Sequence, residues 1–281
     1  MPRAKVNGIQ LYYESHGHGE ALVLISGTGG SCDSWLRYQV PTFAQEYQVL
    51  IFDHRGVGRS DKPDEPYSTR GFASDAVGLL DVLGIEKAHF MGQSMGGRVA
   101  QWVALDFPER VRSLILSSSG SGRYAPHVEI LRGLPLNQME RMIGLGYDRW
   151  WETHFADNDF MFPAEVRVQQ PDLLEQRREL ARHNKPPLRT YLRHVIARQQ
   201  HETTERLGEI EAPTLVLVGE RDTTIGGTGN HVEAATVLAE CIPNAQLAVF
   251  EGAAHGYLWQ MPELANGVVL DFLRSVERLD E

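Results

Sequence analysis

Short apolar runs alternate with amphipathic stretches along most of this chain, and the alternation predicts strands and helices in turn. The runs from residue 21 onward are almost wholly apolar, which is typical of strands buried on both faces of a parallel sheet. The stretch 69–83 instead repeats apolar residues at helical spacing, so we expect a helix that covers the sheet. The predicted strands are 9–13, 21–25, 48–52, 88–91, 113–117, 214–218 and 246–250, and the predicted helices are 35–45, 69–83, 94–106 and 262–276. This order predicts an α/β domain with a mostly parallel sheet.

The alternation stops after Ser117 and resumes near residue 214. The stretch between them contains no comparable apolar run, is rich in arginine and aromatic residues, and is divided by prolines into short helical pieces. We therefore predict that residues 1–119 and 207–281 build one sheet domain, and that residues 120–206 form helices inserted into it.

Composition and charge narrow the classes of function. The 281 residues are 42% hydrophobic and carry a formal net charge of -10, whereas proteins that bind nucleic acid or anionic membranes need clustered Lys and Arg. No stretch approaches the ~20 apolar residues of a membrane span, and the N-terminus has no apolar signal-peptide core. The only cysteines, Cys32 and Cys241, are far apart, so no disulfide framework is predicted. His16 and His18 have too few companions for a metal site, and no metal or other cofactor is expected. We expect a soluble, cytoplasmic protein whose partner is a small molecule, and the sequence leaves a homodimer open.

Ser94 is the most informative residue in the chain. It is the centre of Gly92-Gln93-Ser94-Met95-Gly96, which lies between a predicted strand and a predicted helix. A serine hydroxyl is a weak nucleophile unless a tight strand-to-helix turn exposes it near a base and near donors for an oxyanion. Glycines on both sides relieve the crowding of such a turn. A five-residue pattern of this kind also recurs by chance, so its weight depends on the partners that the rest of the chain supplies.

A base and a carboxylate follow two later strands. His255 lies in a loop of small residues directly after the last predicted strand, and Asp222 follows the strand before it. Because the C-terminal ends of parallel strands open on the same edge of a sheet, both loops can reach Ser94. In this arrangement the histidine removes the serine proton, and the carboxylate holds the imidazole in the required tautomer. Taken singly, these would more often be a surface-loop histidine and a turn-forming aspartate, and Glu220 competes with Asp222 for the acid role.

Two backbone amides are candidates for an oxyanion hole. The amide of Met95 follows Ser94 at the start of a predicted helix, where unpaired N–H groups and the helix dipole favour anions. The second candidate is the amide of Thr28 in the glycine-rich turn 26–30, which follows a predicted strand. This turn could also simply be a flexible connection, and it lacks the Lys-Ser/Thr ending of a phosphate loop.

Together, these motifs resemble the α/β-hydrolase fold family over essentially the whole chain. The order Ser94, Asp222, His255 matches the family's order of nucleophile, acid and base. The motif Asp-His-Arg-Gly-Val-Gly-Arg-Ser at 53–60 resembles the family's loop after the fourth strand, where we expect an arginine to anchor neighbouring backbone. The resemblance implies a mostly parallel eight-stranded sheet flanked by helices, with the inserted helices as a cap. Ser26 stands where many relatives have histidine, which changes what packs behind the oxyanion turn.

The resemblance implies a serine hydrolase that forms an acyl-enzyme, with carboxylic esters and lactones as the expected substrates. A serine at position 94 disfavours the family's dehalogenases and epoxide hydrolases, which carry aspartate there. Residues 94–97, 108–111 and 252–263 are similar to carbon-carbon hydrolases that act on a ring-fission dienoate, although the turn 26–30 lacks their extended His-Gly-Gly-Gly-Pro-Gly form. Small amidases share the same signature, and small-molecule receptors built on this scaffold keep the triad but signal through the cap. These three alternatives stay open.

The cap is expected to select the substrate. Trp150 and Trp151 form an aromatic cluster that could roof an apolar pocket or could simply pack the cap interior. Gly27 in the oxyanion turn and Tyr257, just after His255, are the other candidates for the pocket wall. Arginines are frequent in the cap, but most helical arginines are only solvated, so none is assigned to a substrate carboxylate.

Overall fold

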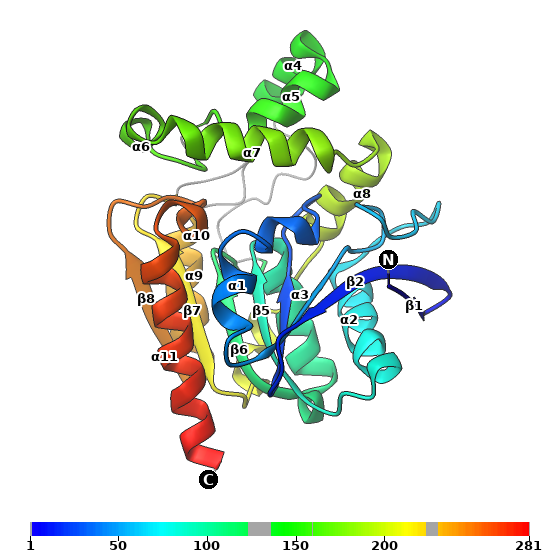
Figure 1. Cartoon of the computed structure of the whole chain (residues 1–281), viewed down its shortest axis with the longest axis vertical. Helices are drawn as coiled ribbons and strands as arrows, with labels where there is room; N and C mark the ends of the chain where they lie inside the picture. Colours follow the sequence, from blue (N-terminus) through cyan, green and yellow to red (C-terminus); the bar gives the residue numbers. More distant parts are fainter. Residues whose placement is uncertain (1, 123–135, 159, 223–229, 281) are drawn as a thin grey trace.

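A single eight-stranded sheet forms the centre of the computed structural model, which describes residues 2–122, 136–158, 160–222 and 230–280 (Figure 1). The strand order is β1-β2-β4-β3-β5-β6-β7-β8, with antiparallel pairs at β1–β2 and β2–β4 and parallel pairs throughout the rest. The strands are β1 (Arg3–Val6), β2 (Ile9–His16), β3 (Ala21–Ile25), β4 (Gln48–Phe52), β5 (Ala88–Gln93), β6 (Val111–Ser117), β7 (Thr214–Gly219) and β8 (Ala245–Phe250). The prediction of a mostly parallel eight-stranded sheet is confirmed.

The apolar runs explain the central strands but not the first one. Every residue of β3 and of β7 is buried, as a strand covered on both faces requires. The sequence pattern does not predict β1, because this strand has only four residues and alternates Arg3 and Lys5 outward with Ala4 and Val6 inward. Its antiparallel pairing with β2, rather than its own composition, makes it a strand.

Helices cover both faces of the sheet. The helices are α1 (Gln39–Phe43), α2 (Thr69–Leu83), α3 (Met95–Asp106), α4 (Leu136–Leu145), α5 (Tyr147–His154), α6 (Ala164–Gln169), α7 (Pro171–His183), α8 (Leu188–Gln199), α9 (His231–Cys241), α10 (Tyr257–Gln260) and α11 (Pro262–Asp280), with 3-10 turns at Cys32–Trp35, Pro108–Arg110 and Thr204–Glu209. α2, α3 and α9 bury Phe72, Val99 and Leu238 on one face, whereas α1 and α11 bury Phe43 and Phe272 on the other. No helix among the described residues is both long and apolar enough to span a membrane.

The helices α4 to α8 lie between β6 and β7 in the chain and gather beyond one end of the sheet (Figure 1). Parallel strands deliver the loops that follow them to the same edge, so these inserted helices stand over the loops after β3, β5, β7 and β8. The chain therefore has the helical insertion that its sequence predicts. The boundaries of that insertion stay predictions, and residues 123–135 and 159 within it lie outside the described residues.

The helices differ from the predicted pattern in two places. The stretch 35–45 is divided into the 3-10 turn Cys32–Trp35 and the short α1, because Pro41 has no N–H to donate to the carbonyl four residues earlier. α9 is absent from the predicted pattern, because its buried face is formed largely by the alanines Ala234 and Ala235, which make a weak apolar signal.

The chain turns sharply from β5 into α3, and glycines make this turn possible. A Cβ on Gly92 would lie 2.2 Å from the carbonyl carbon of Gly96, and a Cβ on Gly96 would lie 2.1 Å from the carbonyl oxygen of Ile25. Backbone atoms cannot move aside without separating α3 from the sheet. The two glycines therefore let the helix begin directly against β3 and β5.

We expect Gly96→Ala to destabilise the protein by about 3 kcal/mol or more, because the added methyl overpacks a contact between two backbone segments. Gly267→Ala in α11 is the matched control, since among the described residues no atom outside its own stretch of helix backbone lies within 4 Å of its added Cβ. That change should leave stability unchanged or raise it by up to about 1 kcal/mol, because alanine favours a helix over glycine. Urea unfolding of both variants measures the difference, and equal midpoints would contradict the crowding.

His154 in α5 is a buried histidine that has no acid beside it among the described residues. It is 6% exposed and stacks on Trp150 with ring centroids 4.3 Å apart. Burial lowers its pKa from 6.5 to about 3, and nearby arginines act in the same direction. The unfolded chain therefore binds a proton at His154 near pH 6.5, whereas the folded chain does not bind it until far lower pH. Stability consequently decreases as the pH falls through this window.

Acidification from pH 7 to pH 5 should cost the wild-type protein about 2 kcal/mol more stability than it costs His154→Gln, which cannot take up this proton. His18→Gln, at an exposed histidine, is the control for replacing a histidine with glutamine. The measurement is the free energy of unfolding in urea at both pH values. The same pH dependence in all three proteins would show that His154 is not held neutral by burial.

Candidate active site

Ser94 immediately precedes α3 and has a backbone conformation that residues other than glycine avoid. Its φ is +56° and its ψ is -116°. Its amide donates a hydrogen bond of 2.8 Å to the carbonyl of Ser117, and the hydroxyl of Ser119 donates one of 2.8 Å to its carbonyl. These bonds to the end of β6 and the loop after it hold the strained residue in place.

The glycine-rich turn after β3 lies directly against Ser94. A Cβ on Gly27 would lie 3.3 Å from the Cβ of Ser94 and 3.8 Å from its Oγ. The Gly30 amide donates to the Gly27 carbonyl at 3.1 Å and so closes the turn. Within the described chain, the amides of Thr28 and Met95 donate to no acceptor. One of these N–H groups follows Ser94 and the other lies in the adjacent turn, so both are available to an oxyanion.

Ser26, Trp35 and His54 form the support behind this turn. The Ser26 hydroxyl accepts a hydrogen bond of 2.9 Å from Nε1 of Trp35 and donates one of 3.2 Å to the carbonyl of Ser31. Nε2 of the buried His54 donates to the Ser26 carbonyl at 3.2 Å. Burial lowers the pKa of His54 to about 4, so the ring is neutral at neutral pH. An indole and an imidazole from other segments thus support the turn from behind.

The motif 53–60 anchors backbone through its aspartate, and the expectation that an arginine does so is wrong. The buried carboxylate of Asp53 accepts hydrogen bonds of 2.8 Å from the amides of Cys32 and Arg59. Arg59 also donates its Nε to Asp53 at 3.1 Å, and Arg55 pairs with Asp75 at 2.7 Å. A buried carboxylate requires such donors, so the aspartate takes the backbone amides and the arginines take carboxylates.

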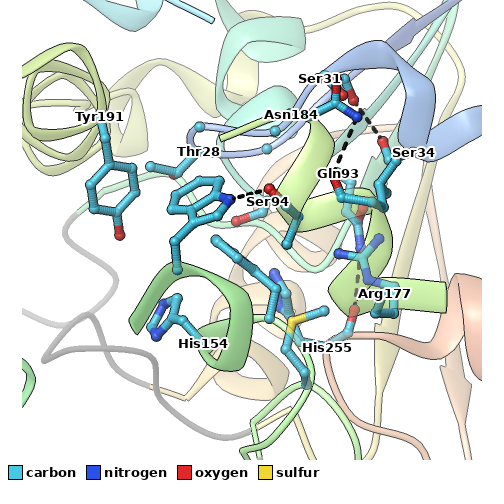
Figure 2. Close-up of a pocket in the computed structure, with 18 of the residues that line it drawn as sticks. Thr28, Ser31, Ser34, Gln93, Ser94, His154, Arg177, Asn184, Tyr191 and His255 are labelled. Carbon is cyan, nitrogen blue, oxygen red and sulfur yellow. Dashed lines mark hydrogen bonds between the residues drawn. The ribbon is translucent and has the colours of Figure 1, made fainter. Parts of the chain in front are cut away.

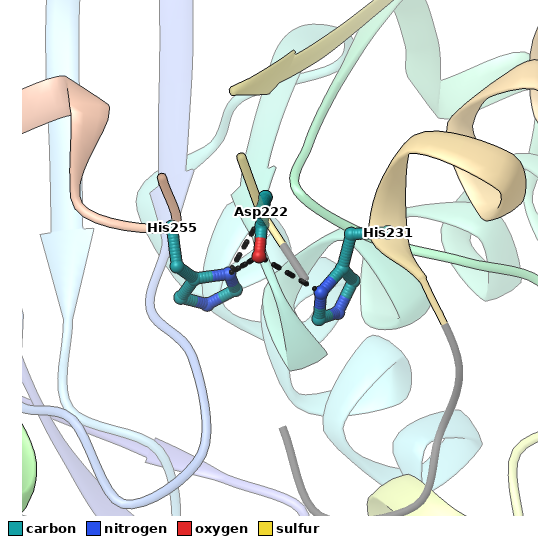
Figure 3. A group of neighbouring side chains, drawn as sticks. All are labelled: Asp222, His231 and His255. Atoms are coloured by element: carbon teal, nitrogen blue, oxygen red, sulfur yellow. Dashed lines mark hydrogen bonds and ion pairs between the residues drawn. The ribbon is translucent and has the colours of Figure 1, made fainter. Parts of the chain in front are cut away.

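Asp222 is completely buried just beyond β7 and faces two histidines (Figure 3). Nδ1 of His255 lies 2.9 Å from Oδ2 and 3.1 Å from Oδ1 of this carboxylate, to which it donates. Nδ1 of His231, the first residue of α9, lies 3.0 Å from Oδ1. Glu220, the competing acid, instead accepts a hydrogen bond of 2.9 Å from the amide of Gly252. The structure therefore brings the predicted base together with Asp222.

The two histidines control the charge of Asp222. Burial raises the pKa of its carboxyl, but His231 and His255 outweigh burial and hold the pKa well below its ordinary value. Burial lowers the pKa of His231 despite the adjacent carboxylate. At neutral pH an ionised Asp222 thus lies beside a neutral His231. The donor atoms of the three residues lie within 4.8 Å of one another, a spacing that could hold a metal ion, although the His255 hydrogen bond uses the same atoms.

A cavity of about 940 Å³, part of it open to solvent, lies between this edge of the sheet and the inserted helices (Figure 2). Ser94, His255 and the turn 27–30 line it from the sheet, and Trp151 and Tyr191 line it from the helices. Its wall combines aromatic rings with a few polar groups, as sites for small organic molecules do.

Ser94 and His255 face this cavity together but are not hydrogen-bonded to each other in the part of the chain that the structure describes. Nδ1 of His255 is engaged by Asp222, which leaves Nε2 for an external proton. The backbone of His255 is fixed, because its amide donates to the Phe160 carbonyl at 2.9 Å and its carbonyl accepts from Gln93 at 3.2 Å. Hydrogen bonds between a nucleophile and its base are often long before substrate binds and tighten in the complex.

Two arginines of the inserted helices, Arg177 and Arg198, line the cavity without a carboxylate partner among the described residues. The buried Nε atoms of both have no hydrogen-bond partner there. Burial lowers the pKa of Arg177 to about 10 and also lowers that of Arg198. Both guanidinium groups therefore stay protonated at neutral pH and leave the cavity positively charged. The sequence does not distinguish these two arginines from the others in the cap. The adjacent Arg178, for example, lies in the same sequence context as Arg177 but pairs with Asp157.

Two of the four predicted wall residues line the cavity, and two do not. Gly27 and Trp151 are among the lining residues, and Trp151 donates its Nε1 to the Ala181 carbonyl at 3.0 Å. Trp150 instead packs in the cap interior, where it is 1% exposed. Tyr257 is buried as well, since its hydroxyl lies 2.6 Å from Oγ of Ser117. Large aromatic side chains gain most from complete burial, so adjacency in sequence to Trp151 or His255 does not bring them to the wall.

His231, Arg177 and Arg198 are residues of the candidate site that the sequence does not predict. No motif surrounds His231, and only its position at the start of a helix that follows the acid loop could have indicated it. The arginines could have been found only by knowing which cap arginines lack an acidic neighbour in space.

Comparison with known proteins gives relatives over nearly the full length. The chain is 30% identical to a "Putative carbamate hydrolase RutD" of Azorhizobium caulinodans, over 99% of this chain and 100% of that protein. It is 32% identical to a 2-hydroxy-6-oxononadienedioate/2-hydroxy-6-oxononatrienedioate hydrolase of Burkholderia vietnamiensis, over 95% and 91% of the two chains.

A solved structure supports the same relationship. The chain superposes with a TM-score of 0.78 and 29% identity on Est816, described as an N-acyl homoserine lactone degrading enzyme, over 96% of this chain and 100% of that one. A family model described as "alpha/beta hydrolase fold" matches residues 20–262, and the chain therefore belongs to the α/β-hydrolase fold family, as a hydrolase of that fold.

Proposed function

We propose that this protein is a serine hydrolase that cleaves a carboxylic ester or lactone of a small organic molecule through an acyl-enzyme. The observation that carries the proposal is the convergence, at one cavity, of Ser94 on its strained turn with a His255 that is already hydrogen-bonded to Asp222. A buried, ionised carboxylate fixes the tautomer of the imidazole and stabilises its protonated form, as a general base requires.

The reaction follows from these positions. Nε2 of His255 takes the proton of the Ser94 hydroxyl as Oγ bonds to the substrate carbonyl carbon, and the carbonyl electron pair moves onto oxygen. The amides of Met95 and Thr28 donate hydrogen bonds to this oxyanion. The C–O bond to the leaving alcohol then breaks, and the alcohol takes the proton from His255. Water repeats the sequence on the acyl-enzyme, releasing the acid and restoring Ser94. In a lactone the leaving alcohol stays tethered to the acyl group.

Ser94→Ala should lower turnover of p-nitrophenyl esters by at least ~10³-fold, because no other hydroxyl replaces the nucleophile. The matched control is Ser34→Ala, a second serine of the cavity wall whose hydroxyl donates to the Ser31 carbonyl at 3.0 Å. It should retain activity within about threefold of wild type. Circular dichroism confirms folding, and intact-mass measurement after a phosphonate ester should find an adduct in the wild type and none in Ser94→Ala. Wild-type rates in folded Ser94→Ala would refute the nucleophile.

The unpaired arginines support a substrate that carries a carboxylate away from the cleaved bond. Arg177 and Arg198 are charged, partly desolvated and without an acid among the described residues, so an anionic ligand would supply the missing partner. A hydrogen bond to a charged group contributes about 1.5–3 kcal/mol, which corresponds to roughly tenfold to a hundredfold in kcat/KM.

Arg177→Gln should lower kcat/KM for a mono-p-nitrophenyl ester of a dicarboxylic acid by roughly tenfold to a hundredfold and change that for a neutral ester of equal length by less than about threefold. Arg178→Gln, the neighbour on α7 that pairs with Asp157 outside the cavity, is the control and should change neither value. Paired kinetics on the two esters give the comparison. Equal losses on both esters would contradict a charge-specific contact.

A second candidate is hydrolysis of a carbon-carbon bond in a ring-fission dienoate. The specific observation in its favour is that a relative 32% identical over 95% of this chain is named for a nonadienedioate, a dicarboxylate that the two arginines would suit. Adding such a dienoate and a homoserine lactone to the ester panel separates the chemistries by their kcat/KM values. Repeated turnover of any member would also set aside a receptor that only binds its ligand.

A further inference from the structure

One buried histidine connects the inserted helices to the glycine-rich turn 26–30. His194 lies in α8 and is completely buried. Its Nδ1 accepts a hydrogen bond of 3.3 Å from the amide of Gly29, and its Nε2 lies 2.8 Å from the carbonyl of Arg55. One imidazole thereby joins three segments that are distant in sequence: the turn after β3, the loop after β4 and the cap.

The two partners fix the tautomer of His194. A backbone amide can only donate and a carbonyl can only accept, so Nδ1 must be unprotonated and Nε2 must carry the hydrogen. Burial lowers the pKa of His194 to about 3, and the nearby His54 acts in the same direction. The ring is therefore neutral at neutral pH and keeps its acceptor aimed at Gly29.

The ring of His194 has no room to move. Its centroid lies 4.9 Å from that of Phe72 and 5.7 Å from that of Tyr67. A Cβ on Gly56 would already lie 3.2 Å from its Nε2. The Arg55 segment is held in turn, because the guanidinium donates two hydrogen bonds of 2.7 Å to Asp75 on α2. His194 is thus a fixed point from which the turn can be positioned.

Hydrogen bonds occupy two of the three amides in this turn and leave the third without an acceptor among the described residues. The Gly30 amide is bonded to Gly27 within the turn, and the Gly29 amide is bonded to His194. The Thr28 amide alone among these three has no acceptor in the described chain. Gly29 has a φ of +70°, and a Cβ there would lie 2.8 Å from Trp151 and 2.9 Å from Tyr191, so cap aromatic rings pack against the same backbone.

We propose that His194 is a positioning residue, through which cap helix α8 holds the Gly29 amide and so orients the adjacent Thr28 amide toward the oxyanion formed at Ser94. This inference rests on the proposed function, because it assumes that Thr28 stabilises an oxyanion. The effect is on kcat more than on KM, since the oxyanion exists in the transition state and not in the bound substrate.

Two substitutions of His194 separate the contributions of its two hydrogen bonds. In His194→Asn the side-chain oxygen takes the place of Nδ1 and can still accept from Gly29, whereas in His194→Gln the amide group takes the place of Nε2 and the Gly29 bond is lost. His89→Gln is the control, at an equally buried histidine whose ring bonds to Ser113 at the start of β5 and β6, away from the cavity. Rates on a p-nitrophenyl ester are divided by the active sites counted with a phosphonate, so that unfolded protein does not enter kcat.

We expect His194→Gln to lower kcat at least tenfold with KM within about threefold, His194→Asn to recover most of kcat, and His89→Gln to keep the wild-type kcat. An unchanged kcat in His194→Gln, or equal losses in both His194 variants, would overturn the positioning role. Failure of the proposed function is seen separately, as an absence of Ser94-dependent turnover in the wild type.

If neither His194 variant folds, NMR of the wild-type protein tests the positioning role instead. Nitrogen NMR of the histidine rings should find Nε2–H on His194 and a coupling across the hydrogen bond from the Gly29 amide. The Gly29 amide resonance should also shift when the phosphonate adduct places an oxygen against Thr28. The opposite tautomer, or a Gly29 resonance unaffected by the adduct, would overturn the proposal.

Discussion

The contact between Gly96 at the start of α3 and the carbonyl of Ile25 at the end of β3 is the constraint on which the rest of the site depends. Because no Cβ separates them, the first turn of α3 meets the sheet with its free amides at the strand ends. The same closeness forces Ser94 to a positive φ and brings Gly27 so near that a Cβ on it would lie 3.3 Å from the Cβ of Ser94. Strain at one residue and proximity of two donor amides are consequences of a single packing distance.

The two sides of the cavity differ in how their charges are balanced. On the sheet side, the buried Asp222 is surrounded by His255 and His231, so its charge is satisfied within the protein. On the cap side, Arg177 and Arg198 keep their charges without an acid among the described residues. Uncompensated charge at a partly desolvated position is costly for a folded protein, and it persists where a ligand completes the pair. We therefore propose that the sheet carries the catalytic groups and that the cap selects the charge of the substrate.

The sequence was sufficient for the elements whose signal is local. Continuous apolar runs predicted the parallel strands, and the placement of Ser94, Asp222 and His255 after three of them predicted that they would share one edge. It was insufficient where a role depends on neighbours in space. Trp150 and Trp151 are adjacent in sequence, yet a helical turn directs one into the cap core and the other to the cavity. His231 and His194 belong to no motif, because each acts through a partner from another segment.

The cap contacts both the proposed base and the proposed oxyanion turn through hydrogen bonds to their backbone amides, and not only through the cavity wall. The carbonyl of Phe160 accepts a hydrogen bond from the amide of His255, the proposed base, and Nδ1 of His194 accepts one from the amide of Gly29 in the proposed oxyanion turn. Such bonds have narrow distance limits, so a shift of the cap by even one ångström alters the placement of a base or a donor amide. Cap variation on this scaffold would then change the rate of the chemical step together with the choice of substrate. A cap that selects a substrate by shape can in this way also make catalysis depend on the position of the cap over the sheet.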